Sequence, residues 1–463
     1  MSFSPVCHHQ LPVRWYRCFL LLLLLTPLGP LGCQMLFHDK DAILKGQTVN
    51  LAVTVPQVPP PASRPLSAPP AVSPQPPAPH PPPLPPQLLP QQRNTSQNLA
   101  ALPPGVQTAN GETFESIRAL ANSVDIVLSG RTITEDTTLS GTVLITGSLV
   151  VAPQATLRLA PGARLFFQRP PGSQQHPRLV IQGRLVVAGT PQQPVLLTAA
   201  AYPEVQSVDW GGVLLLNTEK KNRLDYCHIQ GAETGLEARY AQFDSRGLEI
   251  TRSRDGMALY DSVATLQATN TMQRCDRGLV ADNSELEMHG VLLRENRLGA
   301  ALRHTSLMAN DCRFFANSQD GLELDHCRFR ITGSQAVQNR TGLLVQGGEG
   351  QLQRCRFAQN RASGVSLTEA RVKIVNTSFQ ENGGVGLRLE ASRGSVTQST
   401  FTQNRGGNLV NLGTDGFAAV LNWWGTGDEA HVMAGIRDAT RDAAGIGRIS
   451  FVPLLTSPPP LVP

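Results

Sequence analysis

The sequence predicts an all-β fold, namely a right-handed parallel β-helix with about 21–22 residues per coil. The main observation is a glycine that returns at intervals of 21 or 22 residues and opens an apolar pair each time. Two further columns keep the same interval, one apolar and one of asparagine. The glycines are Gly235, Gly256, Gly278, Gly299, Gly321, Gly342, Gly364, Gly386 and Gly407.

The two other columns indicate how the coils would be joined. In coils stacked about 4.8 Å apart, equivalent residues lie above one another and form ladders. We expect the apolar ladder to pack inside the solenoid and the asparagine amides to hydrogen-bond along the stack. The apolar column is Ile229, Ile250, Met272, Leu293, Phe314, Ala336, Phe357, Phe379 and Phe401, and the polar column is Asn296, Asn317, Asn339, Asn360, Asn382 and Asn404.

Each repeat has the pattern of short strands separated by turns. In the unit "GVSLTEARVKIVNTSFQEN", apolar and polar residues alternate, with breaks near residues 369–371 and 380–384. Alternation of this kind has the period of a β-strand. The consensus of leucine-rich repeats, which have a similar length, is missing. Three strands per coil therefore describe the unit best.

The ends of the predicted solenoid carry their own signals. The runs "GTVLITGSLVV" and "LVVAGTPQQPVLLTAA" predict three or four coils before Gly235. A short helix with Phe114 and Leu120 on one face is expected to plug the open end, where strand edges would otherwise be exposed. Trp423 and Trp424 have two interpretations, a plug at the other end or a platform that stacks on a sugar ring.

These stretches carry a resemblance to a known family. The succession "GTVLITGSLVV", "APGARLFF", "DWGGV", the glycine repeats and "NWWG" resembles bacterial secreted right-handed β-helix proteins of the pectin-lyase-like superfamily. The resemblance covers roughly residues 125–456. It implies the fold but no single activity, because the superfamily includes lyases, hydrolases, epimerases and adhesins.

The N-terminus has the features of an export signal. A basic stretch precedes the apolar run from Cys18 to Leu25, which is too short to span a bilayer and suits a signal peptide. The run is followed by Leu31-Gly32-Cys33, which resembles a bacterial lipoprotein signal and implies lipidation of Cys33. Pro30 departs from that motif, and Gln34 is compatible with delivery to the outer membrane. An ordinary signal peptide with a cysteine near its cleavage site is the alternative.

A proline-rich segment separates this signal from the predicted solenoid. Seventeen of the 35 residues from Pro56 to Pro90 are proline, so the segment can form neither sheet nor helix. A stiff stalk and a disordered spacer are both compatible with this composition. The predicted division is a signal peptide at 1–32, a mature segment at 33–55, a proline-rich linker at 56–110, the β-helix at 111–426, and a C-terminal cap and tail at 427–463.

The cysteines of the predicted solenoid have three interpretations. Cys312 and Cys355 occupy equivalent positions two coils apart, near 10 Å, which is too far for a disulfide. A zinc site has only the sequence "DHCRF" in its favour, and no metal or cofactor is predicted. We expect Cys227, Cys312 and Cys355 to be small buried residues in the column that elsewhere holds serine and threonine.

One turn edge is the strongest candidate for a ligand site. Stacked acids and histidines near the fifth residue after each glycine would form a ridge that could bind a metal or a sugar, or supply an acid and a base. The alternative is that turn positions are polar because they are exposed. The ridge consists of Asp261, Asp282, His304, Asp325 and His326.

A second candidate is a row of cations. Asn-Arg steps before several glycines, together with outward arginines, could line one side of the solenoid for acidic glycans or lipopolysaccharide. A solvated edge is the alternative. The candidate contacts are Arg313, Arg356, Arg340 and Arg361.

The predicted function is a non-catalytic cell-envelope protein that presents a rigid surface to glycans or proteins. Its expected partners are an acidic polysaccharide or envelope component and the membrane, through the lipid on Cys33. Nucleic acid is excluded as a partner, because the net charge is only +5 and the sequence has no dense stripe of lysine and arginine. A polysaccharide-active lyase, hydrolase or epimerase is the alternative, disfavoured because Glu237 and Glu323, on the expected catalytic face, lie four coils apart.

Overall fold

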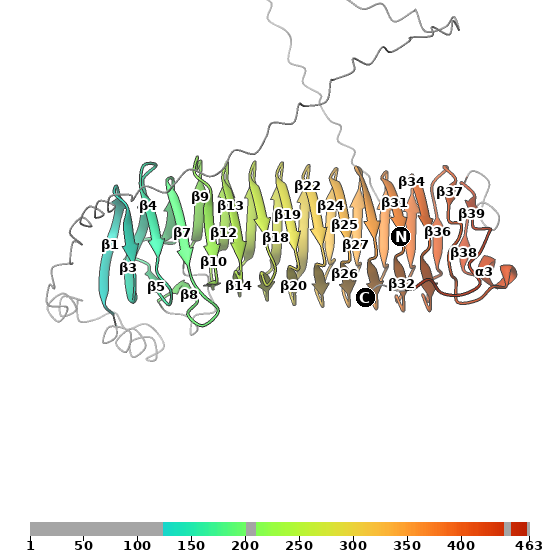
Figure 1. The fold of residues 1–463 in the computed structure, drawn as a ribbon, viewed down its shortest axis with the longest axis horizontal. Helices are drawn as coiled ribbons and strands as arrows, with labels where there is room; N and C mark the ends of the chain where they lie inside the picture. The colour runs from blue at the N-terminus through green and yellow to red at the C-terminus, as the bar shows by residue number, and fades with distance from the viewer. Residues whose placement is uncertain (1–123, 201–209, 439–445, 461–463) are drawn as a thin grey trace, which may run out of the picture. The chain divides into compact units, whose positions relative to one another are not determined.

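The computed structural model describes residues 124–200, 210–438 and 446–460. These residues form a long solenoid of parallel strands (Figure 1), which confirms the predicted parallel β-helix. The signal peptide, Cys33, the proline-rich linker and the plug helix were predicted for residues outside the described ones. No helix among the described residues is long and apolar enough to cross a membrane.

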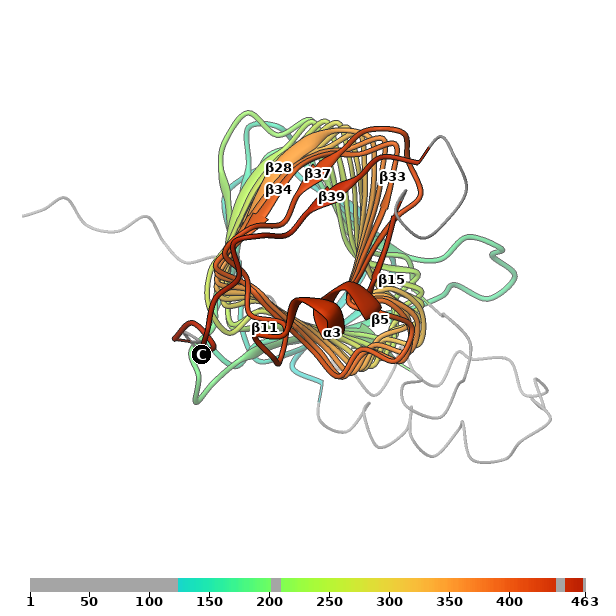
Figure 2. The same cartoon turned by 90° about the vertical axis from the view of Figure 1, so that its right-hand side faces the viewer.

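Most coils contribute one strand to each of three faces, which Figure 2 shows in a view along the axis. The first face continues from coil to coil with parallel register. Its strands are β6 (Arg178–Ile181), β9 (Gly212–Leu216), β12 (Thr234–Arg239), β15 (Asp255–Tyr260), β18 (Arg277–Asp282), β21 (Leu298–Arg303), β24 (Leu322–Asp325), β27 (Leu343–Gln346), β30 (Val365–Thr368), β33 (Leu387–Glu390), β36 (Leu409–Asn411) and β38 (Ile436–Arg437).

The second face is a separate 14-stranded parallel sheet. Four of its strands precede Gly235, in agreement with the predicted three or four early coils. Its strands are β2 (Thr137–Leu139), β4 (Thr156–Leu159), β7 (Arg184–Ala188), β10 (Asn222–Asp225), β13 (Gln242–Arg246), β16 (Val263–Leu266), β19 (Glu285–His289), β22 (Ser306–Asn310), β25 (Arg328–Thr332), β28 (Glu349–Gln353), β31 (Arg371–Val375), β34 (Arg393–Thr397), β37 (Phe417–Ala418) and β39 (Ile449–Ser450).

The third face completes each coil and joins the first face through two long early strands, β1 (Ile126–Ile133) and β3 (Thr142–Val151). Strand β3 pairs with β5 by its first half and with β6 by its second half. The other strands are β5 (Arg164–Gln168), β8 (Val195–Ala199), β11 (Cys227–Gln230), β14 (Glu249–Thr251), β17 (Thr271–Gln273), β20 (Leu292–Arg294), β23 (Arg313–Phe315), β26 (Gln335–Val337), β29 (Arg356–Ala358), β32 (Ser378–Gln380) and β35 (Thr400–Thr402).

The predicted apolar column forms one continuous ladder on the inner side of the third face. Strand register joins every predicted member, from Ile229 to Phe401. Near the C-terminal end the rings of Phe379 and Phe401 stack with centroids 4.6 Å apart. Because burial of these side chains removes apolar surface from water in every coil, the ladder stabilises the stack along its length.

The glycine column is explained by the close approach of neighbouring coils. A Cβ on Gly278 would lie 2.5 Å from the carbonyl oxygen of Gly299 and 2.8 Å from the side-chain nitrogen of Asn296. Only glycine leaves room for this contact. The ninth member was predicted one residue too early. Register places Asn408, not Gly407, above Gly386, because this coil spans 22 residues, as the step from Asn382 to Asn404 does.

The asparagine column forms the predicted hydrogen-bonded ladder. The backbone N–H of Asn317 donates to Oδ1 of Asn339, and the N–H of Asn339 donates to Oδ1 of Asn360, both at 3.0 Å. The Nδ2 group of each amide donates to a backbone carbonyl, as Asn339 does to Phe314 at 2.9 Å. All members except Asn404 are buried, so the ladder satisfies polar backbone groups that water cannot reach.

The described cysteines are free and buried, as the ladder interpretation predicts. The N–H of Cys312 donates to Oγ of Ser334, and the N–H of Cys355 donates to Oγ1 of Thr377. Cysteine, serine and threonine therefore share one column, as expected. Burial raises the pKa of the Cys227 thiol to about 12, which keeps it protonated and unsuited to nucleophilic or metal chemistry.

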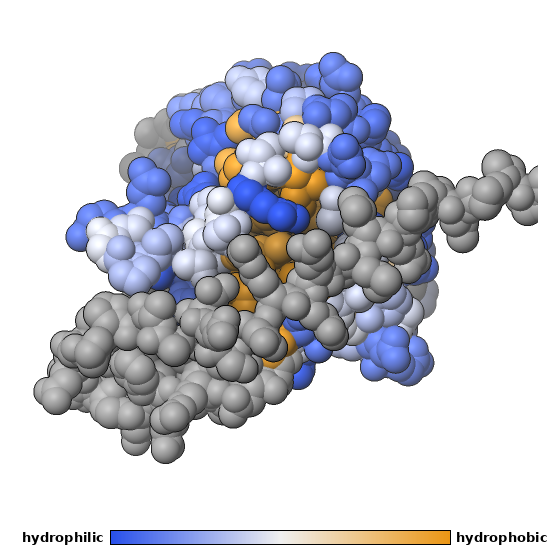
Figure 3. Space-filling view, turned by 90° about the vertical axis from the view of Figure 1, so that its left-hand side faces the viewer, coloured by the Kyte–Doolittle hydropathy of each residue, from blue (hydrophilic) through white to orange (hydrophobic). Residues whose placement is uncertain are grey.

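The ends of the solenoid are apolar and one of them is closed. Trp424 is buried and its ring stacks on Phe401 with centroids 4.6 Å apart, which confirms the plug interpretation for this tryptophan. Helix α3 (Glu429–Ala434) lies at the same end and packs against β38. Figure 3 shows apolar surface gathered at the opposite end, where β1 lies. Strands β38 and β39 extend the solenoid beyond residue 426.

Candidate functional site

The candidate site is a shallow groove of about 410 Å³ on the first face, between β15 and β27. Its floor is the outward column of that face, in which Val280, Ala301, Glu323 and Leu344 are neighbours in register. Three of these side chains are apolar, and Glu323 alone carries an ionisable group. The floor therefore offers a narrow apolar strip with a single carboxyl group in it.

The upper wall of the groove contains part of the predicted ridge. Register places Tyr260, Asp282, Arg303, Asp325 and Gln346 side by side on consecutive strands. They project outward because they are two residues beyond the floor positions on the same strands. All five line the groove. Two ridge acids therefore lie in a single row with an arginine between them.

Within that wall, one carboxylate is held by an arginine. Arg303 donates to both oxygens of Asp282, at 3.2 and 2.5 Å. These hydrogen bonds hold the pKa of Asp282 below its ordinary value. Asp282 is therefore an ionised partner of Arg303 at neutral pH.

The remaining ridge residues sit at the corner after the wall. The rings of His304 and His326 lie 5.8 Å apart, and Nδ1 of His326 is 2.6 Å from Asp325. Asp261 accepts a hydrogen bond from Asn283. In each of these coils, one residue in the left-handed conformation turns the chain at this corner. Asp261 and His304 are two of these residues, and both have a φ of 47°. The structure thus brings four ridge residues together and leaves Asp261 at the end of the row.

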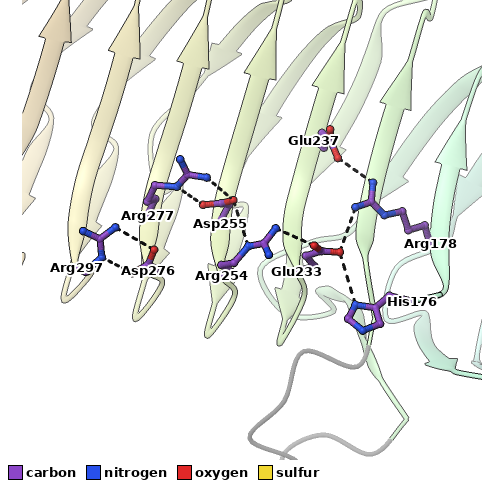
Figure 4. A network of polar contacts seen from close by, with 9 residues as sticks. All are labelled: His176, Arg178, Glu233, Glu237, Arg254, Asp255, Asp276, Arg277 and Arg297. Carbon is purple, nitrogen blue, oxygen red and sulfur yellow. Dashed lines mark hydrogen bonds and ion pairs between the residues drawn. The ribbon is translucent and has the colours of Figure 1, made fainter. Parts of the chain in front are cut away.

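Arg277 lines the opposite side of the groove, the lower wall, and belongs to a ladder of ion pairs that runs along the turns before the glycine column. Arg277 donates to both oxygens of Asp255, at 2.6 and 2.8 Å, and Arg297 does the same to Asp276. Asp255 is buried and needs this partner. Figure 4 shows that the pairs continue to Arg254 and further early-coil residues. Each carboxylate in this ladder therefore already forms an ion pair with an arginine.

The two glutamates of the outward column have different surroundings. Glu237 is buried and accepts hydrogen bonds from Arg178 at 3.0 Å and Arg239 at 2.6 Å. Among the described residues, Glu323 forms no ion pair with an arginine, and it lies beside Asp320, which Arg340 neutralises. Burial raises the pKa of Glu323 to about 7, and the hydrogen bond and charge of Asp320 act in the same direction.

Asp320 stays ionised although its side chain is fully buried. Burial alone would raise its pKa, but hydrogen bonds from Arg340 and from the backbone N–H of Thr341 outweigh that effect. Its pKa therefore lies below the ordinary value. Arg340 therefore pairs with ionised Asp320, and Asp320 in turn contacts Glu323, whose pKa is near neutral pH.

The four predicted glycan-contact arginines occupy two places. Arg313 and Arg356 are exposed on the third face, two coils apart, with Gln335 between them. Arg340 is bound to Asp320, and Arg361 donates to the backbone carbonyl of Ser318. The arginines thus do not form one continuous row, and their contact with glycan remains a prediction.

Sequence reasoning missed two partners of the groove. Asp320 and Arg277 fall at the residue before the repeat glycine, a column that also holds Thr234, Leu298 and Thr341 and shows no common chemistry. Only the alignment of one coil with the next reveals that Arg277 contacts Asp255 and that Asp320 contacts Arg340. A search for opposite charges at a separation of 20 to 22 residues would have found the pairs, because the bonded partners are spaced that way.

Two family models match parts of the chain. The model described as "Periplasmic copper-binding protein (NosD)" matches residues 211–429, and the model described as "Pectate-lyase like beta helix domain" matches residues 131–240. No curated protein matches the chain.

Several solved structures are similar at low identity. The periplasmic alginate epimerase AlgG is 14% identical, with 68% of this chain and 78% of that chain covered and a TM-score of 0.25. The pectate lyase Pel9A is 14% identical, with 66% and 70% covered and a TM-score of 0.21. The Dettilon tailspike protein gp208 is 10% identical, with 74% and 64% covered and a TM-score of 0.26.

The copper in the name of one family model can be tested against the side chains present. Among the described residues, no three histidine, cysteine, aspartate or glutamate side chains are grouped to hold a metal ion. The nearest approach is the pair His304 and His326, but Nδ1 of His326 faces Asp325. The described cysteines are buried in the solenoid. The described residues therefore do not fit a copper centre.

Proposed function

We propose that this protein, a pectin-lyase-like parallel β-helix, is a non-catalytic protein of the cell envelope that binds a glycan in the groove of its first face. The observation that carries the proposal is the set of three rows in register. An apolar floor lies between two walls of paired charges. Sugars present apolar C–H faces and hydroxyl edges, so a strip flanked by fixed hydrogen-bonding groups is complementary to a chain of them.

The carboxylates of the groove that already have partners support binding over catalysis. Hydrolysis of a glycosidic bond usually needs two free carboxyl groups on either side of the bond. Of the carboxylates that line the groove beside Glu323, Asp282 is held by Arg303, and Asp325 lies 2.6 Å from Nδ1 of His326, so both already have partners. Paired side chains of this kind are well placed to orient a ligand, because their geometry is fixed before the ligand arrives.

The envelope location is part of the proposal. The family model that matches residues 211–429 is named for a periplasmic protein, which supports an envelope or secreted location. Lipidation of Cys33 would attach the chain to a membrane and leave the solenoid free to meet polysaccharide. Labelling with a radioactive or alkyne-bearing fatty acid, compared between the native chain and Cys33→Ser, tests that attachment.

The binding site can be tested by filling the floor of the groove. Ala301→Gln places a long neutral side chain on the floor without removing any ion pair. Ser366→Gln is the matched control, because Ser366 belongs to the same outward column but lies outside the groove. On a glycan array we expect the native chain and Ser366→Gln to bind the same sugars and Ala301→Gln to bind them about tenfold more weakly. Equal binding by all three would contradict the proposed site.

A polysaccharide-active enzyme is the second candidate, and Glu323 is the observation that favours it. A carboxyl group whose pKa is near 7 can act as a general acid or base at neutral pH. Turnover of uronate-containing polysaccharides by the native chain, with loss of turnover in Glu323→Gln, would establish this function. Binding without product in both chains would exclude Glu323 from catalysis on those substrates.

A further inference from the structure

A second groove lies on another face of the solenoid and is lined by cations. It has a volume of about 660 Å³ and runs across β22, β25, β28 and β31 of the second face. Two outward rows form it. Register joins Arg328, Glu349 and Arg371 in one row. It joins Arg330, Gln351 and Lys373 in the other.

The cations of this groove are mostly unpaired, unlike the arginines of the first face. Arg328 and Glu349 approach to 3.5 Å, but both side chains are largely exposed, so the pair is weak. Within the described chain, no ion pair involves Arg330, Arg371 or Lys373. Four cations and one carboxylate leave the lining with a net charge of +3.

The cations are arranged in a regular pattern because each row repeats with the coil. Arg330 and Lys373 are two coils apart, about 10 Å, with Gln351 between them. Arg328 and Arg371 repeat this spacing two residues earlier on the same strands, about 7 Å away. The four positive groups therefore mark the corners of a rectangle whose long side follows the axis of the solenoid.

We propose that this groove binds a linear acidic polysaccharide that lies along the solenoid axis. A polyuronate carries one carboxylate on each sugar ring, and each ring advances the chain by about the height of one coil. Carboxylates two rings apart would thus meet the cations two coils apart, while the Gln351 amide is placed to bond the ring between. Met308, which is 45% exposed at the head of the second row, offers an apolar contact for a ring face.

The groove is less suited to nucleic acid. Single strands are held by bases that stack on exposed aromatic rings. The aromatic ring in this groove is that of Phe329, which is only 3% exposed because it packs inward beneath Gly350. A regular polyanion without bases fits the lining better. The proposal is independent of glycan binding on the first face, since the two grooves share no residue.

The test measures binding of polyuronate and of neutral glucan oligosaccharides to the whole chain by calorimetry. The double variant Arg330→Ser with Lys373→Ser removes two cations of the groove. The matched control Arg158→Ser with Arg223→Ser removes two exposed cations from the early coils of the same face at the same two-coil spacing. We expect polyuronate to bind the native chain and the control alike, and the groove variant about tenfold more weakly.

Further outcomes separate this site from the first face. Ala301→Gln is expected to leave polyuronate binding unchanged, and raised ionic strength is expected to weaken binding to the native chain. The proposal is overturned if the groove variant binds polyuronate as the native chain does, or if Ala301→Gln alone abolishes binding. It is also overturned if single-stranded DNA binds with the same affinity and the same dependence on Arg330 and Lys373.

Discussion

At the scale of single residues, the environment of Glu323 separates binding from chemistry. Its carboxyl group lies on the groove floor beside an ion pair that is already complete. The sequence shows a glutamate at an outward position, but it does not show Asp320 as its neighbour. The perturbed pKa of Glu323 follows from that contact and from burial, and both depend on how consecutive coils stack.

The raised pKa of Glu323 makes a prediction about stability and pH. An acid whose folded pKa is raised contributes stability below its ordinary pKa of 4.5 and loses it as pH rises through about 7. Glu323→Gln stays neutral, so above about pH 8 it should be more stable than the native chain by on the order of 1 kcal/mol, allowing for solvent screening. Urea unfolding at several pH values measures the difference. A gain that persists near pH 4 would contradict the assigned cause.

At the scale of elements, the strand ladders follow from the sequence more completely than the groove does. The inward columns of phenylalanine and asparagine have uniform chemistry, so their period could be read from one chain. The walls of the groove mix acids, arginines and leucine at one position, as in Asp255, Arg277 and Leu298. Their order has no period, and the charges find partners only when neighbouring coils are aligned. The second-face cations were missed because each row alternates them with Glu349 or Gln351, so neither row has uniform chemistry in the sequence.

The asparagine ladder makes a prediction at this scale. Asn339→Ala removes the acceptor for the Asn317 N–H and the donor to the Phe314 carbonyl, all of them buried. We expect a loss of about 2–3 kcal/mol in the free energy of unfolding, because buried polar groups are left without partners. Gln338→Asn is the control, since Gln338 is the exposed neighbour in the left-handed conformation, which asparagine tolerates. Equal stability of both variants would contradict the role of the ladder.

At the scale of the whole molecule, each coil contacts its neighbours and little else. In such a solenoid, stability is nearly a sum of local terms, and damage at one end stays local. Trp424 ends the ring stack that runs through Phe379 and Phe401. A plug was one of the two interpretations that the sequence allowed for the adjacent tryptophans near the last repeat. The one-residue displacement at Gly407 shows the limit of following one residue type, because the aligned position holds Asn408 and a glycine stands beside it.

Removal of the plug gives a prediction for the molecule as a whole. Trp424→Ala should increase hydrogen exchange in β35 and β36 while the strands from β9 to β27 keep their protection. Trp423→Ala, which changes a less buried neighbour, should have a smaller effect. Hydrogen–deuterium exchange followed by mass spectrometry measures the protection of each strand in both variants. Uniform loss of protection along the solenoid would show that the coils unfold as one unit.

The most direct measurement of the central claim is a crystal structure of the whole chain with a bound oligosaccharide selected on the glycan array. We predict an intact sugar chain over Val280, Ala301 and Glu323, with its hydroxyl groups bonded to the two walls of paired charges. A cleaved, unsaturated or epimerised sugar in the groove would contradict the non-catalytic function. A sugar bound elsewhere, with the groove empty, would contradict the proposed site.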